Sequence, residues 1–388
     1  MRLIRKLFII LIICTISLLK ADAITSYFYS DALGYDMYYE IVLPPSYESN
    51  PDSTYPSIYF LHGFGLDYSW YGSVVSVFED MMASGEIRES ILIKPDGFVI
   101  PYLGSMYTNS DYNGQFEDYI VQDLISHIDG SYNTIDHSSY RAIMGHSMGG
   151  YGAVKLSVKF PELFQVAASH SGPIAIENVI PDLLPVLLAE TGILGYQPWN
   201  GTVSLFMYSA SAAFSPDVDD WPYYVDLPVD YYGNVVDEVW DLWLGHDPLT
   251  LAQENLANIQ SIHFYMDCGD QDDYLFYNHS TSFSEFLDEE NINHVYEIYP
   301  GDHFTEVLNG DRFPYSLAFI ENAFYIHDLF SSLGDIDANG SVTMADFILL
   351  LQIVLQFEQS TEIQQTAGDL DFNGTIDIFD LLLLADQL

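Results

Sequence analysis

The chain has 388 residues, and 49% of them are hydrophobic, which excludes an intrinsically disordered polymer. Ten Lys and Arg residues stand against 56 Asp and Glu residues, so the formal net charge is −46. A protein with this negative charge is repelled by nucleic acid and by anionic membranes, and we expect neither as a stable partner. Adaptation to a saline medium and the ordinary acidity of a secreted protein both remain open as causes of this charge.

The first residues have the pattern of a targeting segment. A basic start at residues 2–6 precedes a nearly unbroken apolar run from Leu7 to Leu19, and the small residues around Asp22 form a cleavage site after Ala23. The apolar run is shorter than the roughly 20 residues that span a bilayer. The sequence therefore predicts a signal peptide at residues 1–23 and a secreted, extracellular protein without stable membrane association.

Strands and helices alternate over residues 24–330, which predicts an α/β domain with a mostly parallel sheet. The helices are expected at Glu117–His127, where apolar residues share one face, and at Gly150–Lys159. The strands are expected at Met37–Leu43, Ser57–Leu61, Ser90–Lys94, Tyr140–Met144, Gln165–Ala168, Ser261–Met266 and His294–Tyr299.

Residues 172–248 break this alternation, because they are long, proline-interrupted and rich in aromatic residues. We interpret them as an insertion that covers one end of the sheet. Ordinary packing of a large loop and a role in binding substrate are both open, the second through rings between Trp221 and Trp243.

Gly145-His146-Ser147-Met148-Gly149-Gly150 predicts a nucleophile elbow, because a predicted strand precedes it and a predicted helix follows it. Ser147 is the expected nucleophile, and the helix dipole favours the negative charge that develops beside it. A serine hydroxyl needs a base to act as a nucleophile. In proteins with a nucleophile elbow, the acid and then the histidine follow the serine in the chain.

His303 is the expected base, because among the histidines it alone lies in a late, glycine-flanked loop after a final strand. The histidines that flank motif glycines, His62 and His146, are expected to hydrogen-bond locally. The acid should follow the preceding strand, where four carboxylates compete at positions 267, 270, 272 and 273. Sequence position alone leaves the choice among these four open.

The oxyanion of a tetrahedral intermediate requires backbone donors. One is expected to be the amide of Met148, directly after the nucleophile. The other should come from the loop His62-Gly63-Phe64-Gly65, and Phe64 is our choice. No cofactor is expected to take part in catalysis.

These motifs resemble the esterase family of the S-formylglutathione hydrolases, the mycolyltransferases and the feruloyl esterase modules. The resemblance covers residues 35–325 and implies an α/β-hydrolase fold. It also implies that the acid is Asp272, the Asp three residues after the Gly of a Cys-Gly-x-x-Asp pattern that begins at Cys268. Two departures stand out, the long insertion and Gly301-Asp302-His303 in place of Gly-Gly-His.

Residues 331–388 form a second, small domain with two similar segments that start at Asp335 and Asp369. Oxygen donors at fixed steps, with glycine at the sixth position, are typical of calcium loops, so we expect two calcium ions and a helix after each loop. The expected ligands are Asp335, Asp337, Asn339, Ser341 and Asp346 in the first loop, and Asp369, Asp371, Asn373, Thr375, Asp377 and Asp380 in the second.

This duplicated loop and helix resembles a type I dockerin, an all-α module that docks to cohesin domains of scaffold proteins. The resemblance implies a cohesin-type partner for residues 333–388. Many dockerins carry Ser-Thr at loop positions 10 and 11, where this chain has Met344-Ala345 and Ile378-Phe379.

The sequence thus predicts a secreted carboxylic ester hydrolase that works through an acyl-enzyme. Feruloyl or acetyl esters on polysaccharides are the expected substrates, by association with the docking module. The alternatives are an acyltransferase of the mycolyltransferase type and a non-catalytic binding or scaffold protein with a hydrolase fold. The intact serine, acid, histidine and glycines argue against the last.

Overall fold

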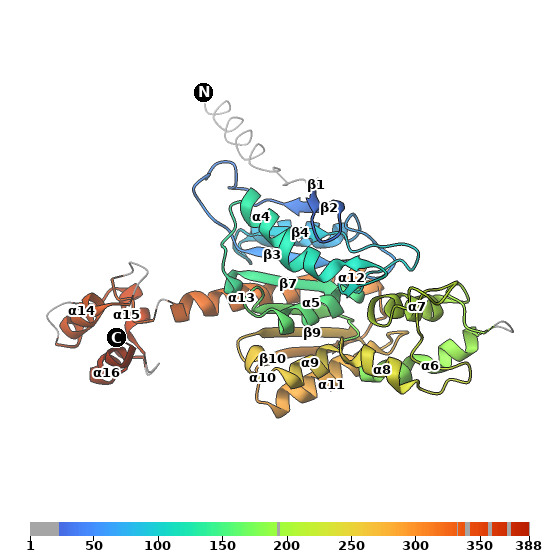
Figure 1. The fold of residues 1–388 in the computed structure, drawn as a ribbon. Helices are drawn as coiled ribbons and strands as arrows, with labels where there is room; N and C mark the ends of the chain where they lie inside the picture. The colour runs from blue at the N-terminus through green and yellow to red at the C-terminus, as the bar shows by residue number, and fades with distance from the viewer. Residues whose placement is uncertain are drawn as a thin grey trace, which may run out of the picture. The chain divides into compact units, whose positions relative to one another are not determined.

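Figure 1 presents a computed structural model of the protein, which describes residues 23–191, 195–331, 333–337, 342–355, 359–370 and 374–387. The expected signal peptide lies outside the described residues except for Ala23, and it stays a prediction. The chain divides between Ile320 and Glu321 into two compact units. Within the described residues, no helix is both long enough and apolar enough to cross a membrane.

The larger unit is built on an eight-stranded sheet with the order β1-β2-β4-β3-β7-β8-β9-β10. The strands from β4 to β10 pair in parallel, whereas β2 is antiparallel to both β1 and β4. This confirms the predicted α/β class. The strands are β1 (Ile24–Ser30), β2 (Tyr35–Val42), β3 (Ser57–Leu61), β4 (Ile91–Pro95), β7 (Arg141–His146), β8 (Val166–His170), β9 (His263–Gly269) and β10 (His294–Tyr299), and a separate hairpin pairs β5 (Asn109–Ser110) with β6 (Gly114–Gln115).

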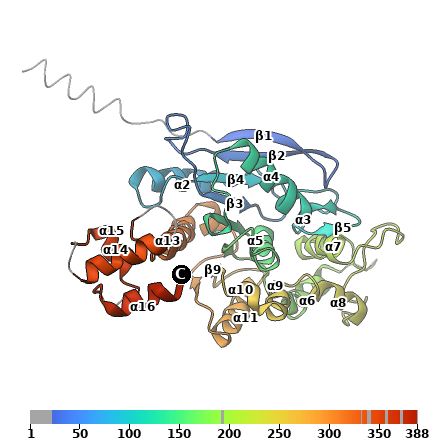
Figure 2. The same cartoon turned by 60° about the vertical axis from the view of Figure 1, so that its left-hand side comes forward.

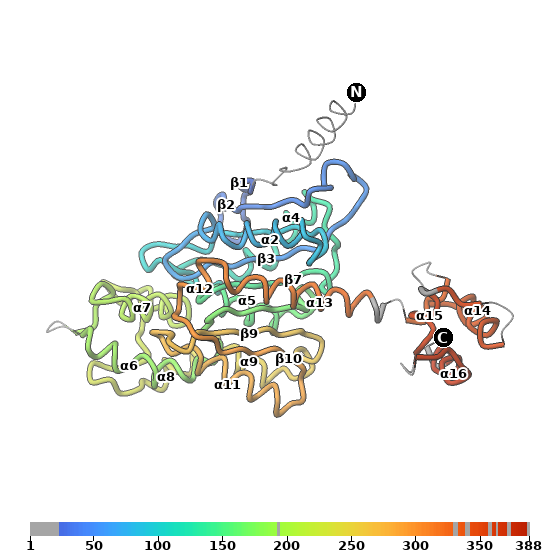
Figure 3. The backbone as a smooth tube through the Cα atoms, turned by 180° about the vertical axis from the view of Figure 1, so that it is seen from behind, coloured from blue at the N-terminus to red at the C-terminus, as the bar shows by residue number. Residues whose placement is uncertain are grey.

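Helices cover both faces of this sheet, which is why every residue of the central strands β3, β4, β7 and β8 is buried. Helices α4 and α5 lie over one face in Figure 1, and α2 and α13 lie over the other in Figure 3. The helices of this unit are α2 (Gly72–Ser84), α3 (Phe116–Asp118), α4 (Ile125–Ser131), α5 (Met148–Lys159), α6 (Val179–Glu190), α7 (Thr202–Phe214), α8 (Asp237–Leu244), α9 (Pro248–Glu254), α10 (Leu256–Ile259), α11 (Phe276–Glu289), α12 (Thr305–Leu308) and α13 (Phe313–Ser331), the last of which continues past Ile320.

Two local features differ from the expectation. Strand β1 was not predicted, and it pairs with β2 at the edge of the sheet (Figure 2). Four of its seven residues are exposed. The predicted helix at Glu117–His127 is interrupted, because Tyr119–Leu124 forms a π-helical turn between α3 and α4. Its buried apolar face is as predicted, and only the hydrogen-bond spacing differs.

The described residues of the insertion at 172–248 include the helices α6, α7 and α8, which gather at one end of the sheet in Figures 1, 2 and 3. Helix α7 is buried along most of its length and packs against α6 and α8. Its residues Val203, Phe206 and Met207 belong to the main hydrophobic core. The insertion is therefore a packed part of the larger unit.

The smaller unit is helical, as predicted, with α14 (Met344–Val354), α15 (Glu362–Gly368) and α16 (Ile378–Gln387). Helices α14 and α16 pack on each other. They close a separate core made by Ile336, Leu350, Ile353, Ala367, Leu381 and Leu384. Helix α14 follows the first acidic segment and α16 follows the second, so the sequence duplication corresponds to a structural one.

Candidate active site

Ser147 occupies the sharp turn between β7 and α5. Its backbone has φ 56° and ψ −119°, a strained conformation for a residue with a side chain. The turn brings α5 so close to β3 that a Cβ on Gly149 would lie 1.9 Å from the carbonyl oxygen of Leu61. Glycine is therefore required there, and the tight packing holds Ser147 in its strained conformation.

Ser147, His303 and Asp272 lie in hydrogen-bond contact. His303 Nε2 is 2.9 Å from Ser147 Oγ, and His303 Nδ1 is 2.6 Å from Asp272 Oδ2. The three residues follow the carboxyl ends of the parallel strands β7, β9 and β10, which meet at one edge of the sheet. Asp272 also accepts a hydrogen bond from the Tyr274 amide at 2.8 Å, which fixes the carboxylate toward the histidine.

The other three candidate carboxylates are engaged elsewhere or exposed, and Asp267 lies within β9 instead of the loop. Asp267 is fully buried and accepts hydrogen bonds from Tyr265 Oη at 2.8 Å and from Arg312 Nε at 2.9 Å. Asp270 and Asp273 are exposed to solvent. Among the four candidates, Asp272 is thus the one that the structure places against His303.

A second Ser-His-Asp arrangement lies in the core, built on the same Asp267. His170 Nδ1 is 2.8 Å from Asp267 Oδ1, and His170 Nε2 is 2.9 Å from Ser316 Oγ. All three residues are completely buried, and Arg312 holds the same carboxylate. No substrate reaches a serine enclosed in this way, so this arrangement ties β8, β9 and α13 together.

The two residues expected to supply oxyanion donors, Phe64 and Met148, both lie near Ser147. Met148 opens helix α5, and the first amides of a helix have no partner within the helix. Phe64 follows β3, and it lines the same pocket as Ser147. Ser147 is thus the N-cap of α5, and negative charge is favoured at a helix N-terminus.

The pocket above Ser147 has about 370 Å³ of space, part of it open to solvent, and its walls are mostly apolar. It is lined by Gly63, Phe64, Leu66, Tyr71, Ser147, Thr202, Phe206, Tyr274, Phe276, His303 and Phe304. No Asp, Glu, Lys or Arg belongs to this described lining. The site therefore fits an uncharged group beside the serine.

The insertion contributes to this pocket through α7. Thr202 and Phe206 line it, whereas the tryptophans at 221, 240 and 243 are absent from its described lining. Trp243 is buried and donates a hydrogen bond to Ser215 Oγ at 3.0 Å, and Trp221 is 77% exposed. The insertion thus supplies one described aromatic ring of the lining, Phe206 of α7, and the other rings come from outside the insertion.

His146 does not bond locally, contrary to the expectation. Its ring contacts the Tyr71 hydroxyl and the backbone carbonyl of His303, 75 and 157 residues away. His62 contacts its neighbour Gly63, as expected, and also the distant Gly97 amide. Tyr71, Tyr274 and the two phenylalanines at 276 and 304 were not singled out, because isolated aromatic residues carry no motif.

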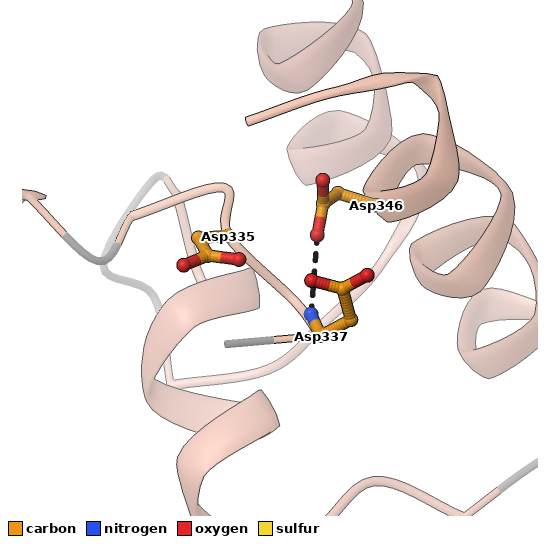
Figure 4. A group of neighbouring side chains, drawn as sticks. All are labelled: Asp335, Asp337 and Asp346. Carbon is orange, nitrogen blue, oxygen red and sulfur yellow. Dashed lines mark hydrogen bonds between the residues drawn. The ribbon is translucent and has the colours of Figure 1, made fainter. Parts of the chain in front are cut away.

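In the smaller unit, the carboxylates of Asp335, Asp337 and Asp346 face one another, with one oxygen from each within 4.8 Å of the others (Figure 4). Asp346 is buried and accepts hydrogen bonds from the amides of Asp337 at 3.1 Å and Thr343 at 2.8 Å. Hard oxygen donors gathered in this way fit calcium. The expected ligands Asn339 and Ser341 lie outside the described residues.

In the second acidic segment, Asp380 is hydrogen-bonded to loop amides much as Asp346 is in the first. Asp380, equivalent to Asp346, is buried and accepts hydrogen bonds from the amides of Leu370 and Asp377, both at 2.7 Å. Asp369 accepts one from Gly374 at 2.8 Å across the loop. Thr375 is described, whereas the expected ligands Asp371 and Asn373 lie outside the described residues.

Comparison with known proteins identifies the family of each of the two units. The sequence model of the family described as "Putative esterase" matches residues 30–313, and that of the dockerin type I domain matches residues 333–388. Esterase Rv1288 of Mycobacterium tuberculosis is 29% identical over 151 residues, which are 39% of this chain and 32% of that protein. An endo-1,4-beta-xylanase/feruloyl esterase of Xylanibacter ruminicola is 27% identical over 164 residues, 40% of this chain and 22% of that protein. The match thus spans about a third or less of each relative's length.

Solved structures share the fold. A ferulic acid esterase superposes with a TM-score of 0.57 at 19% identity, over 78% of this chain and 98% of that one. The S-formylglutathione hydrolase of Staphylococcus aureus gives 0.54 at 20% identity, over 77% and 98%. With the family match over most of the larger unit, the chain belongs to this esterase family of α/β-hydrolases and carries a C-terminal dockerin type I domain.

Proposed function

We propose that the protein is a secreted carboxylic ester hydrolase with Ser147, His303 and Asp272 as its catalytic triad. The observation that carries this proposal is the continuous hydrogen-bond path from Asp272 through His303 to Ser147, at 2.6 and 2.9 Å, under an apolar pocket. A hydrolase fold that only binds or scaffolds has no need of a strained serine aligned with a buried histidine and carboxylate.

The reaction follows from these positions. Ser147 Oγ attacks the ester carbonyl carbon while His303 Nε2 takes the hydroxyl proton. The carbonyl oxygen becomes an oxyanion, which the amides of Phe64 and Met148 stabilise. The intermediate collapses, the bond to the alcohol breaks, and His303 gives its proton to the leaving oxygen. Water then repeats the same steps on the acyl-enzyme and releases the acid. Asp272 stabilises the charged imidazole.

The substrate class follows from the lining and from the second domain. A pocket walled by Phe64, Phe206, Phe276 and Phe304 without described charged side chains accepts an uncharged acyl group. Feruloyl and acetyl groups both meet this requirement. A dockerin domain is consistent with a polysaccharide-linked ester as the substrate, and so is the feruloyl esterase activity in the name of the Xylanibacter relative.

For the smaller unit, we propose that each acidic loop binds one calcium ion and that residues 333–388 dock to a cohesin-type scaffold protein outside the cell. The facing carboxylates of the first loop and the repeated bonding of Asp346 and Asp380 support two equivalent sites. Because these carboxylates repel one another, a cation is needed to hold the loops together.

The test is a comparison of the purified protein with its Ser147→Ala variant on 4-nitrophenyl acetate, methyl ferulate and acetylated xylan. We expect hydrolysis by the protein and none above background by the variant. Equal rates for the two proteins would refute the nucleophile. An added alcohol that captures most of the acyl group in place of water would assign acyl transfer instead of hydrolysis.

A further inference from the structure

A buried chain of hydrogen bonds runs beside the nucleophile and ends on the histidine loop. The Tyr71 hydroxyl is 2.7 Å from His146 Nδ1, and His146 Nε2 is 2.7 Å from the backbone carbonyl oxygen of His303. Tyr71 is 3% exposed and His146 is fully buried, so water does not compete for these bonds. The proposed reaction uses neither side chain.

The positions of the hydrogens in these two bonds follow from whether each atom can donate or accept. A carbonyl oxygen only accepts, so His146 Nε2 carries a hydrogen and donates it to His303. Burial, with the nearby His303 and His170, holds the pKa of His146 well below its ordinary value, so its ring is neutral and Nδ1 accepts. Burial also raises the pKa of Tyr71, which therefore keeps its proton and donates it to Nδ1.

The other end of the chain is tied to the oxyanion loop. The backbone of Gly63 lies against the Tyr71 hydroxyl, since a Cβ at Gly63 would lie only 2.9 Å from that oxygen. Tyr71 itself has φ 61° and ψ 45°, a left-handed conformation that is uncommon for an aromatic residue. The loop that carries Phe64 and the loop that carries His303 are thus joined through two side chains.

We propose that Tyr71 and His146 are positioning residues for His303. The inference rests on the proposed function, in which His303 is the base. His303 lies in the short segment between β10 and α12, and its ring must satisfy Ser147 and Asp272 at once. Anchoring its own carbonyl restricts rotation of the backbone that carries the imidazole. By donating to His146 Nδ1, the Tyr71 hydroxyl favours the tautomer with its hydrogen on Nε2. That tautomer donates to the His303 carbonyl.

Three variants separate this role from general packing. Tyr71→Phe keeps the pocket-lining ring and removes only the donor, so the other tautomer of His146 becomes accessible. We expect kcat to fall about fivefold, the loss typical of one neutral hydrogen bond, with KM unchanged. His146→Leu removes the anchor itself, and we expect a fall of about thirtyfold or more. His146→Gln carries an amide N–H with a reach similar to that of Nε2 and should recover part of the loss.

The deciding readouts are the pH profile of kcat/KM and the NMR resonance of the His303 Nδ1 proton shared with Asp272. We expect the two variants that lack a bond to shift the acid limb and to move or broaden the resonance, with less change in His146→Gln. Lowered melting temperatures with wild-type kcat, acid limb and resonance would overturn the proposal. The resonance is observed without substrate, so it decides on positioning even if no tested ester is hydrolysed, an outcome that would count against the proposed function instead.

Discussion

Asp272 and His303 lie in two loops that are joined by backbone hydrogen bonds as well as by their side chains. Asp272 Oδ2 is 2.6 Å from His303 Nδ1, while the amides of Asp270 and Gln271 donate to the carbonyls of Tyr299 and Gly301, each at 2.8 Å. Because β9 and β10 are neighbouring parallel strands, their loops leave the sheet side by side. The carboxylate and the imidazole are thus held together by the main chain.

The first prediction concerns the choice of acid. Asp272→Asn keeps the size of the side chain but removes the charge that stabilises the imidazolium, so we expect kcat to fall about a thousandfold or more, by analogy with a serine protease triad. Asp270→Asn and Asp273→Asn alter exposed carboxylates and should stay within about twofold of wild type. Rates on 4-nitrophenyl acetate give the comparison.

Asp267→Asn is the informative control in this series. It breaks the buried contacts with His170 and Arg312, so we expect a large loss of stability, while the protein that stays folded keeps its activity. Counting active sites from the acyl-enzyme burst separates the two effects. A near-normal Asp272→Asn enzyme beside an inactive, folded Asp270→Asn enzyme would contradict the assignment.

The second prediction concerns the acyl pocket. Phe206→Ala removes part of its apolar wall, and we expect kcat/KM for methyl ferulate to fall about tenfold relative to 4-nitrophenyl acetate, because apolar pocket contacts discriminate by this order. Trp221→Ala, an exposed ring of the same insertion that is not part of the described lining, is the control and should leave the ratio unchanged. An unchanged ratio in Phe206→Ala would remove the reason for assigning α7 to the substrate.

The strands and helices were predictable where the pattern of apolar residues along the chain determines them. Buried runs such as Ser57–Leu61 predicted central strands, whereas β1 was missed because its residues alternate less clearly and half of them face solvent. That Ser147 and His303 would come together was predictable, because an elbow and a late loop have sequence patterns. Position in the chain left four carboxylates open, and only the family pattern selected Asp272, which the structure places against His303.

Contacts between distant side chains had no comparable signal. His146 was expected to bond locally, yet its partners come from α2 and from the loop after β10, which only the folded sheet brings together. The aromatic density at Trp221–Trp243 left a binding role open, but Trp243 is buried in the core, and Phe206 of α7 is the ring that the insertion contributes to the pocket. Composition predicts that rings will be buried, and the packing of helices decides which of them face the pocket.

The third prediction concerns calcium. Removing it with a chelator should unfold residues 333–388, because the carboxylates around Asp346 and Asp380 are then left close together without a cation. Esterase activity should persist, since no described metal-binding cluster lies beside Ser147. Calorimetry should find two ions per chain, and Asp346→Asn and Asp380→Asn should each weaken one site. Absence of calcium binding to the intact protein would contradict the assignment.

The fourth prediction concerns a buried ion-pair cluster on helix α5, which follows Ser147. Glu117 contacts Lys155 at 3.0 Å and also Lys159, and Lys155 donates to Thr108 Oγ1 at 2.6 Å. Burial alone would raise the pKa of Glu117, but the two lysines hold it below its ordinary value of 4.5, so the carboxylate is ionised at neutral pH. Burial lowers the pKa of Lys155 to about 8, which leaves it charged there as well.

Glu117→Gln leaves Lys155 buried beside a neutral partner, so we expect the free energy of unfolding at pH 7 to fall by about 3–5 kcal/mol in urea titrations. The folded pKa of Glu117 lies below its unfolded pKa, so its stabilisation is present above pH 4.5 and is lost as the pH falls through the folded value. The variant should therefore lose less stability than wild type on acidification below pH 4.5. Glu162→Gln makes the same change of charge at an exposed position near the end of α5 and should behave as wild type. Equal acid dependence in wild type and Glu117→Gln would show that the cluster does not stabilise α5.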